Sequence, residues 1–191
     1  MTIKNKNYRC GHCGNDITSD NGYYTIYSNT YTNAYFGYIY ICHHCLKPTF
    51  FDNDGTQVPG ECPGKTFGES IFQNKLVYTL YNEARSCFSI NAFTSCGMCC
   101  RKILMHIAVD QGAEKDKAFS YYVDFLDENN LIPSNCKEWV SLIRTKGNEA
   151  NHDIIILNNE EANTLLQFIE ILITLIYEMP YKANVIKKVN N

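Results

Sequence analysis

Two Cys-x-x-Cys pairs constrain the fold of this chain more than any other feature of its sequence. The first pair is Cys10-Gly-His-Cys13, and the second is Cys42-His-His-Cys45. Two such pairs on hairpin-like segments can place four thiolates at the corners of a tetrahedron, about 2.3 Å from one Zn²⁺. We therefore predict that these four cysteines bind a structural zinc ion. Four protein ligands leave no coordination position for a substrate, so we expect the metal to stabilise the fold and not to catalyse a reaction.

The residues inside and beside the two pairs fit this prediction. Gly11 and Gly14 allow the backbone to turn back, so that its amides can point at the sulfurs. His12, His43 and His44 lie within the pairs, and we expect them to be exposed or to donate hydrogen bonds to the thiolates. A histidine that replaces one cysteine as a ligand is the open alternative.

The remaining cysteines are predicted to be structural. Cys62 lies in a Gly- and Pro-rich segment and is an alternative zinc ligand. The others belong to predicted helices: Cys87, Cys96, Cys99, Cys100 and Cys136. Cys96-x-x-Cys99 has a metal-binding spacing, but the three cysteines of this helix cannot all converge on one ion. Free cysteines are common as small buried apolar residues, so we expect these to pack in the core.

Charge and hydropathy exclude several classes of protein. The net charge of -3 argues against a protein that coats duplex DNA with positive charge. The most apolar run, Ile169 to Ile176, is too short to span a bilayer and contains Glu170, so no membrane segment is expected. The N-terminus has no apolar signal core, and zinc thiolates need a reducing compartment, so we predict a cytoplasmic location.

Residues 1–50 are predicted to form a small β zinc ribbon. Gly22–Tyr27 and Tyr35–Ile41 are β-favouring runs, and the second leads directly into Cys42. The segment is rich in tyrosine: Tyr23, Tyr24, Tyr27, Tyr31, Tyr35, Tyr38 and Tyr40. These rings could stack on single-stranded bases, but no Lys or Arg lies between Arg9 and Lys47, which favours packing between strands.

The rest of the chain is predicted to be helical. Residues 51–70 are rich in Gly and Pro and are predicted to be a linker, whereas residues 71–185 show apolar side chains at helical spacing. Asn158 and Glu161 form a capping-box pattern before the clearest of these helices, and Pro180 is expected to end it.

Several strings in this helical part resemble a known family. They are Tyr81-Asn-Glu-Ala-Arg85, Cys100-Arg-Lys-Ile-Leu104, Trp139 with Ile143-Arg144, and Gly147-Asn-Glu-Ala-Asn-His-Asp153. Over residues 70 to 185 the chain resembles the domain of unknown function 4145 family, which is placed within the HEPN superfamily (higher eukaryotes and prokaryotes nucleotide-binding). The resemblance implies a helical bundle that often dimerises, in a bacterial or phage defence context. We therefore expect a mainly α protein: an HEPN-like bundle of four to five helices, preceded by the zinc ribbon.

The resemblance also implies a candidate catalytic site. Some HEPN proteins are metal-independent ribonucleases that use an Arg and a His at a dimer cleft, and Arg144 and His152 are the matching residues here. Arg144, Asn148 and His152 recur every four residues, a spacing that lines them along one helix face. Arg101 is a further candidate for phosphate binding.

Two functions remain open. In the enzyme hypothesis, Arg144 binds phosphate, Asn148 orients a 2′-hydroxyl and His152 transfers a proton. Against it, Thr145 follows the arginine and the interval to His152 is one residue longer than in HEPN ribonucleases. We therefore favour a zinc-containing binding or regulatory protein, a homodimer that engages a protein or nucleic acid such as RNA, with the endoribonuclease as the alternative.

Overall fold

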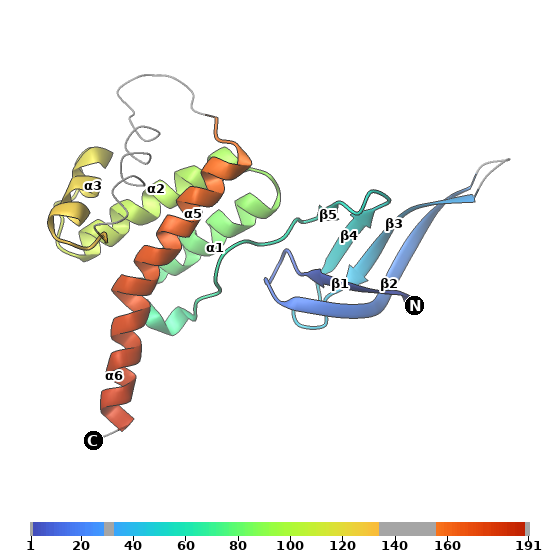
Figure 1. Ribbon diagram of the computed structural model, residues 1–191, viewed down its shortest axis with the longest axis horizontal. Coiled ribbons are helices and arrows are strands. Elements are labelled where there is room, and N and C mark those ends of the chain that lie inside the picture. Colours follow the sequence, from blue (N-terminus) through green and yellow to red (C-terminus); the bar gives the residue numbers. More distant parts are fainter. Residues whose placement is uncertain (1, 29–32, 134–155, 190–191) are drawn as a thin grey trace. The chain divides into compact units, whose positions relative to one another are not determined.

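The computed structural model describes residues 2–28, 33–133 and 156–189 (Figure 1). The chain divides into two compact units. The sheet unit consists of Met1–Pro63 with Ser86–Ala92, and the helical unit consists of Gly64–Arg85 with Phe93–Asn191.

The sheet unit is built on a five-stranded antiparallel sheet in which the strands follow their order in the sequence. Its strands are β1 (Thr2–Arg9), β2 (Asp16–Ser28), β3 (Asn33–Ile41), β4 (Pro48–Asp52) and β5 (Gln57–Val58). The Cys10–Cys13 pair lies in the turn between β1 and β2, and the Cys42–Cys45 pair lies in the turn between β3 and β4. Both pairs therefore come from connections between neighbouring strands.

Aromatic side chains form the core of this sheet beside the cysteines. The ring centres of Tyr8 and Phe51 are 5.2 Å apart, and those of Tyr40 and Phe51 are 5.7 Å apart. Tyr38 stacks on Tyr40 at 6.3 Å, so these tyrosines pack against other rings as the sequence predicted. Tyr23 differs, because 56% of its surface is exposed.

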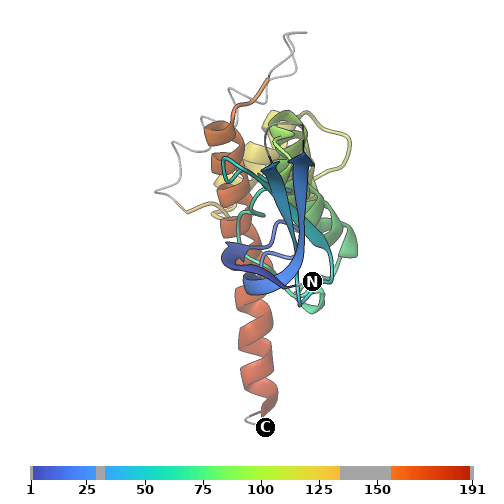
Figure 2. The same cartoon turned by 90° about the vertical axis from the view of Figure 1, so that its right-hand side faces the viewer.

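The helical unit packs α2 against both α3 and α5. Its elements are η1 (Glu69–Ile71), α1 (Lys75–Ser89), α2 (Phe93–Asp110), α3 (Phe119–Glu128), α5 (Asn159–Ile173), η3 (Thr174–Glu178) and α6 (Met179–Val189). Helices α2 and α5 bury apolar side chains such as Ile103, Ile107, Leu166 and Ile169, which have at most 2% of their surface exposed. Figure 2 shows α5, η3 and α6 as one continuous rod.

The start of α5 confirms the predicted capping box, whereas its end corrects the prediction for Pro180. The Asn158 side chain accepts a hydrogen bond from the Glu161 amide, and the Glu161 side chain accepts one from the Asn158 amide. The rod does not end at Pro180 but continues to Val189. A π-helical turn precedes the proline, and Pro180 lies in the first turn of α6, where its missing N–H is tolerated.

Two residues of the family-like string Tyr81–Arg85 anchor the extended segment before η1. The Tyr81 hydroxyl donates a hydrogen bond to the carbonyl oxygen of Lys65 at 2.9 Å. Arg85, which is 4% exposed, donates to the carbonyl oxygen of Gly64 and to the hydroxyl of Thr66. This string therefore has a structural role in the helical unit.

Two acidic side chains of the rod, Glu170 on α5 and Glu178 on η3, hold the segment before η1. The Lys65 amide donates to Glu170 on α5 at 2.9 Å, and the Lys65 ammonium lies 2.5 Å from the Glu178 carboxylate on η3. Lys182 reaches the other oxygen of Glu178 at 2.9 Å. The hydrogen bonds from these two lysines lower the pKa of Glu178.

The expectation of a mainly α protein, with an HEPN-like bundle of four to five helices after a small ribbon, is wrong. The β structure is a five-stranded sheet that extends from Thr2 to Val58, and it forms the greater part of a compact unit of its own. The polar first strand, TIKNKNYR, lacks the apolar alternation that marks a half-buried strand, and the short β4 and β5 lie among Gly and Pro residues.

One helix, Asn159–Lys188, is long and apolar enough to cross a membrane, judged only by length and composition in the described residues. Half of its most apolar stretch is buried inside the structure. The core helix of a soluble protein has the same character.

Candidate metal centre

The structure brings the four predicted cysteines together. The sulfur atoms of Cys10, Cys13, Cys42 and Cys45, named here the cysteine cluster, all lie within 4.8 Å of one another. Cys10 Sγ is 3.8 Å from Cys45 Sγ, and Cys13 Sγ is 3.8 Å from Cys42 Sγ. A tetrahedral site with metal–sulfur bonds of about 2.3 Å has edges of about 3.8 Å. The cluster therefore fits a structural metal ion, and its sulfurs are too far apart for disulfide bonds.

The two Cys-x-x-Cys turns have the same backbone geometry. In the first, the Gly14 amide donates to the Cys10 carbonyl at 2.8 Å; in the second, the Leu46 amide donates to the Cys42 carbonyl at 2.9 Å. In each turn the amide of the first cysteine also donates a hydrogen bond to the carbonyl oxygen of the residue five positions later. Cys10 donates to Asn15, and Cys42 donates to Lys47. The sequence therefore builds two matching turns, each of which presents its pair of sulfurs to the other.

Residues that sequence reasoning missed hold these turns in place. Asn15 Nδ2 donates to the sulfur of Cys13 at 3.3 Å. The Arg9 side chain donates to the Gly14 carbonyl at 3.0 Å, and Gln57 Nε2 donates to the Arg9 carbonyl at 2.8 Å. The sequence could have indicated the role of Asn15, because this residue follows Cys13 by only two positions. It could not have indicated the role of Gln57, because the hydrogen bond from Gln57 to Arg9 depends on the position of β5.

Burial and local hydrogen bonds act differently on the thiols of Cys10, Cys13 and Cys45. Burial raises the pKa of Cys10 to about 12 and also raises the pKa of Cys45. At Cys13 burial acts in the same direction, but hydrogen bonds from Asn15 and from the thiols of Cys10 and Cys42 outweigh it, so the pKa falls to about 7. Burial likewise raises the pKa of the neighbouring Tyr8 to about 12. The cluster thus joins two buried and two half-buried cysteines, and its hydrogen bonds favour the thiolate of Cys13.

The histidines of the two turns lie outside the sulfur cluster. His12 Nε2 is 2.9 Å from the Pro48 carbonyl oxygen, so the tautomer protonated at Nε2 donates to the second turn. His43 and His44 are exposed, with ring centres 4.6 Å apart. Within the described residues the only group of potential ligands close enough to hold a metal consists of the four cysteines, without a histidine or Cys62.

The other cysteines that the structure describes are not members of this cluster. Cys96 and Cys100 are buried in α2, and Cys62 is buried in the sheet unit. Cys87 and Cys99 are half-buried. Cys136 lies outside the described residues.

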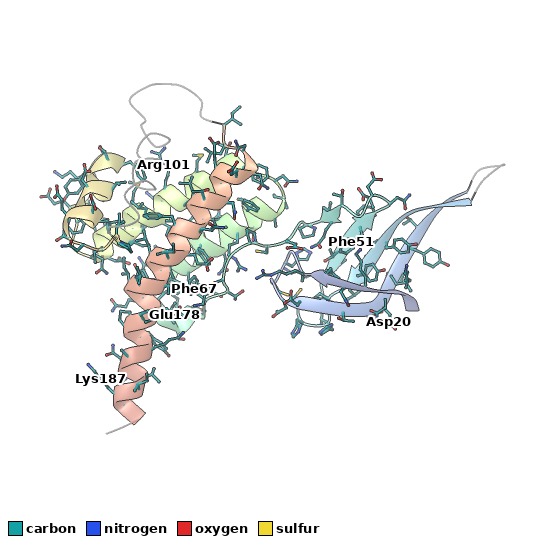
Figure 3. The ribbon with its side chains drawn as sticks, in the orientation of Figure 1. Asp20, Phe51, Phe67, Arg101, Glu178 and Lys187 are labelled. Atoms are coloured by element: carbon teal, nitrogen blue, oxygen red, sulfur yellow. The ribbon has the colours of Figure 1, made fainter. Side chains whose placement is uncertain are left out.

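The candidate catalytic residues Arg144, Asn148 and His152 also lie outside the described residues. Arg101 is on α2, labelled in Figure 3, and its guanidinium carbon lies 4.5 Å from the centre of the Phe119 ring. This cation–π contact holds part of the Arg101 side chain against α3.

Comparison with known proteins identifies the family of the helical part. The model of the domain of unknown function DUF4145 matches residues 82–190, which is more than half of the chain. No curated protein and no solved structure matches the chain. The match begins within α1 and runs through the C-terminal rod, over the region in which the sequence strings resemble this family. The chain belongs to the DUF4145 family.

Proposed function

We propose that the cysteine cluster binds one structural Zn²⁺ and thereby stabilises the sheet unit. The observation that carries this proposal is the pair of 3.8 Å sulfur–sulfur distances, which equal the edge of a tetrahedral zinc–thiolate site. Four thiolates suit Zn²⁺ better than they suit Mg²⁺ or Ca²⁺, which prefer oxygen ligands. A sheet unit of about seventy residues has a small core, so metal binding would supply part of its folding free energy.

We further propose that the protein is a binding or regulatory protein that engages a protein or nucleic-acid partner in a bacterial or phage defence context. The defence context, and the placement of the family within the HEPN superfamily, rest on the sequence resemblance in Gly147–Asp153. The closed set of four ligands supports a binding role, because it offers a substrate no free position on the metal.

The metal is tested by elemental analysis of the protein purified without chelators. We expect about one zinc per chain. Cys13→Ser should lose the zinc, whereas the matched change Cys99→Ser, on α2, should retain it. Protein that lacks zinc, or that keeps it in Cys13→Ser, contradicts the proposed site.

The binding role is tested against the endoribonuclease alternative with mixed RNA in the presence of EDTA. A binding protein leaves the RNA intact in both wild type and His152→Ala. Cleavage that survives the chelator and disappears in His152→Ala shows that the protein is an enzyme. Helical circular dichroism is measured on the same samples, so that unfolding of the helical unit in His152→Ala is not mistaken for loss of activity.

A further inference from the structure

A pocket lined by charges of both signs lies in the helical unit. Its volume of about 390 Å³ falls within the range of small-molecule sites, and its lining includes no residue of the cysteine cluster. The wall comes mainly from one side of α2, with the start of α1, the loop after α2 and one side chain of α3. Figure 1 shows α2 and α3 side by side. The ionisable side chains of charged type in the lining are Lys102, His106, Asp110, Lys115 and Asp116.

Three of these side chains form a row along α2. Lys102, His106 and Asp110 follow one another at intervals of four residues, which a helix places on one side with a rise of about 6 Å per interval. The lysine and the aspartate therefore lie about 12 Å apart along the helix axis. Met105 and Val109 are half-buried in the same wall. The row thus combines a cation, an anion and an apolar stretch between them.

The aspartate at the end of this row is held by a buried tyrosine. Tyr177 Oη donates a hydrogen bond to Asp110 Oδ2 at 2.8 Å, and Tyr177 is only 7% exposed. Tyr177 belongs to η3, and π-helical turns of this kind occur frequently at functional sites. The bond fixes the carboxylate and leaves its second oxygen able to accept a hydrogen bond from a ligand.

The loop after α2 is fixed by the buried Tyr122 of α3, which also lines the pocket. The Tyr122 hydroxyl accepts a hydrogen bond from the Lys117 amide at 3.1 Å. The side chains of Lys117 and Glu114 pair with each other at 2.8 Å. The loop therefore has a defined shape without a ligand, and the charges that it presents to the pocket are Lys115 and Asp116.

The opposite charges of the pocket do not pair with one another. In the part of the chain that the structure describes, neither Lys102 nor Lys115 forms an ion pair, and neither does Asp116. The carboxylate of Asp110 is bonded to Tyr177 and to no cation. A ligand that carries both signs of charge can bridge groups that do not reach each other.

We propose that this pocket binds a small zwitterion, whose carboxylate pairs with the two lysines and whose ammonium group pairs with the two aspartates. Free amino acids and dipeptides share this chemistry. A dipeptide spans about 7 Å, and the long lysine side chains cover the remaining distance along α2. His106, between the two ends, can donate to the carboxylate or accept from the ammonium group. An apolar side chain of the ligand contacts Met105 and Val109.

A phosphate suits this pocket less well than a zwitterion does. Two lysines are opposed by two aspartates, so the formal charge of the lining is zero when His106 is neutral. Each aspartate would repel a phosphate and would itself stay without a cation. A zwitterion is neutral as a whole and offers every charged group of the lining an opposite charge.

Methyl NMR of the intact chain, labelled at its methionine methyl groups, tests this proposal with leucine and leucyl-leucine as probes. Met105 lines the pocket, whereas Met98 and Met179 are exposed elsewhere in the helical unit. We expect at least one probe to shift the Met105 signal, assigned with Met105→Leu, with a dissociation constant below about 1 mM. The signals of Met98 and Met179 should stay in place. The tighter probe identifies the ligand as a free amino acid or as a dipeptide.

Modified probes test the need for both charges. The N-acetyl form of the tighter probe lacks the ammonium group, and its C-terminal amide lacks the carboxylate, so each should bind at least about fivefold more weakly. Inorganic phosphate at about 10 mM should leave the Met105 signal unchanged. Equal binding of the modified and unmodified probes, or a shift with phosphate alone, overturns the proposal.

Variants of the pocket test which residues supply the two charges. Lys102→Gln and Asp116→Asn should each weaken binding at least about fivefold. Both residues are exposed, so neither change should unfold the chain. The matched controls Lys187→Gln, on α6, and Asp54→Asn, in the sheet unit, should bind like wild type. The proposal is overturned if neither probe shifts the Met105 signal at about 10 mM, or if the pocket variants bind as tightly as the controls.

Discussion

Leu46 occupies in the second Cys-x-x-Cys turn the backbone position that Gly14 occupies in the first. Both residues adopt the left-handed backbone conformation, with φ of 58° at Leu46 and 72° at Gly14. Glycine adopts this conformation without steric cost, but leucine does not. Leu46 is also 75% exposed, so its side chain gains little by burial.

Leu46→Gly should therefore stabilise the sheet unit by about 0.5–1 kcal/mol, after allowance for the greater freedom of glycine in the unfolded chain. Thermal unfolding of the zinc-loaded protein, followed by tyrosine fluorescence, measures the change. Gly14→Ala introduces the same conflict into the first turn and should destabilise. Loss of stability in Leu46→Gly would mean that the Leu46 side chain itself makes a stabilising contact.

Gly11→Ala should destabilise the sheet unit by at least about 2 kcal/mol. A Cβ atom at Gly11 would overlap the carbonyl oxygen atoms of Pro59 and Gly60, which are backbone atoms and cannot move aside by a side-chain rotation. The overlap forces the turn and the segment after β5 apart. Urea unfolding of the zinc-loaded variant and wild type provides the comparison.

The matched control for this change is Gly68→Ala. Gly68 has an ordinary φ of -74°, and the nearest atom to its added Cβ would be Ser70 Oγ at 3.7 Å. Its stability should stay close to that of wild type. An equal loss in both variants would show that the effect belongs to alanine substitution in general and not to the close approach at Gly11.

The zinc ligands could be predicted from the sequence because four cysteines in two short pairs allow few other arrangements. The roles of the glycines could be predicted only in part. Gly14 is needed for its backbone conformation, whereas Gly11 is needed because Pro59 and Gly60 pack against it. That second contact joins segments almost fifty residues apart, so no local pattern reveals it.

The same distinction between local and distant contacts applies to the fold. The capping box of Asn158 and Glu161 is local, and the structure confirms it. The size of the sheet depends on pairing between β1 and β2 and between β4 and β5, in which polar or very short strands are stabilised by their neighbours. The continuation past Pro180 depends on a π-helical turn, which shifts the backbone hydrogen bonds just before the proline.

Removal of the metal should unfold the sheet unit and leave the helical unit folded. The core of the sheet unit includes Cys10 and Cys42 themselves, so its packing depends on the turns that the metal holds. Hydrogen exchange with and without a chelator measures this. The amides of Cys10 and Cys42, bonded within their turns, should lose protection, while those of α2 and α5 should not. Equal loss in both units would contradict a purely local role for the metal.

Glu178→Gln should destabilise the helical unit by about 1–2 kcal/mol at pH 7, because it removes charge-assisted hydrogen bonds from Lys65 and Lys182. The pKa of Glu178 is lowered from 4.5 in the folded state, chiefly by Lys65. A lowered pKa contributes stability that is present above about pH 4.5 and is lost as the pH falls through the folded value. The difference in the free energy of unfolding between wild type and variant should therefore shrink below about pH 4.

Urea unfolding at pH 7 and pH 3, followed by helical circular dichroism, tests this prediction. Glu69→Gln is the control, because the Glu69–Lys75 pair is exposed. A difference that does not depend on pH would show that Glu178 stabilises the rod by packing and not by its charge.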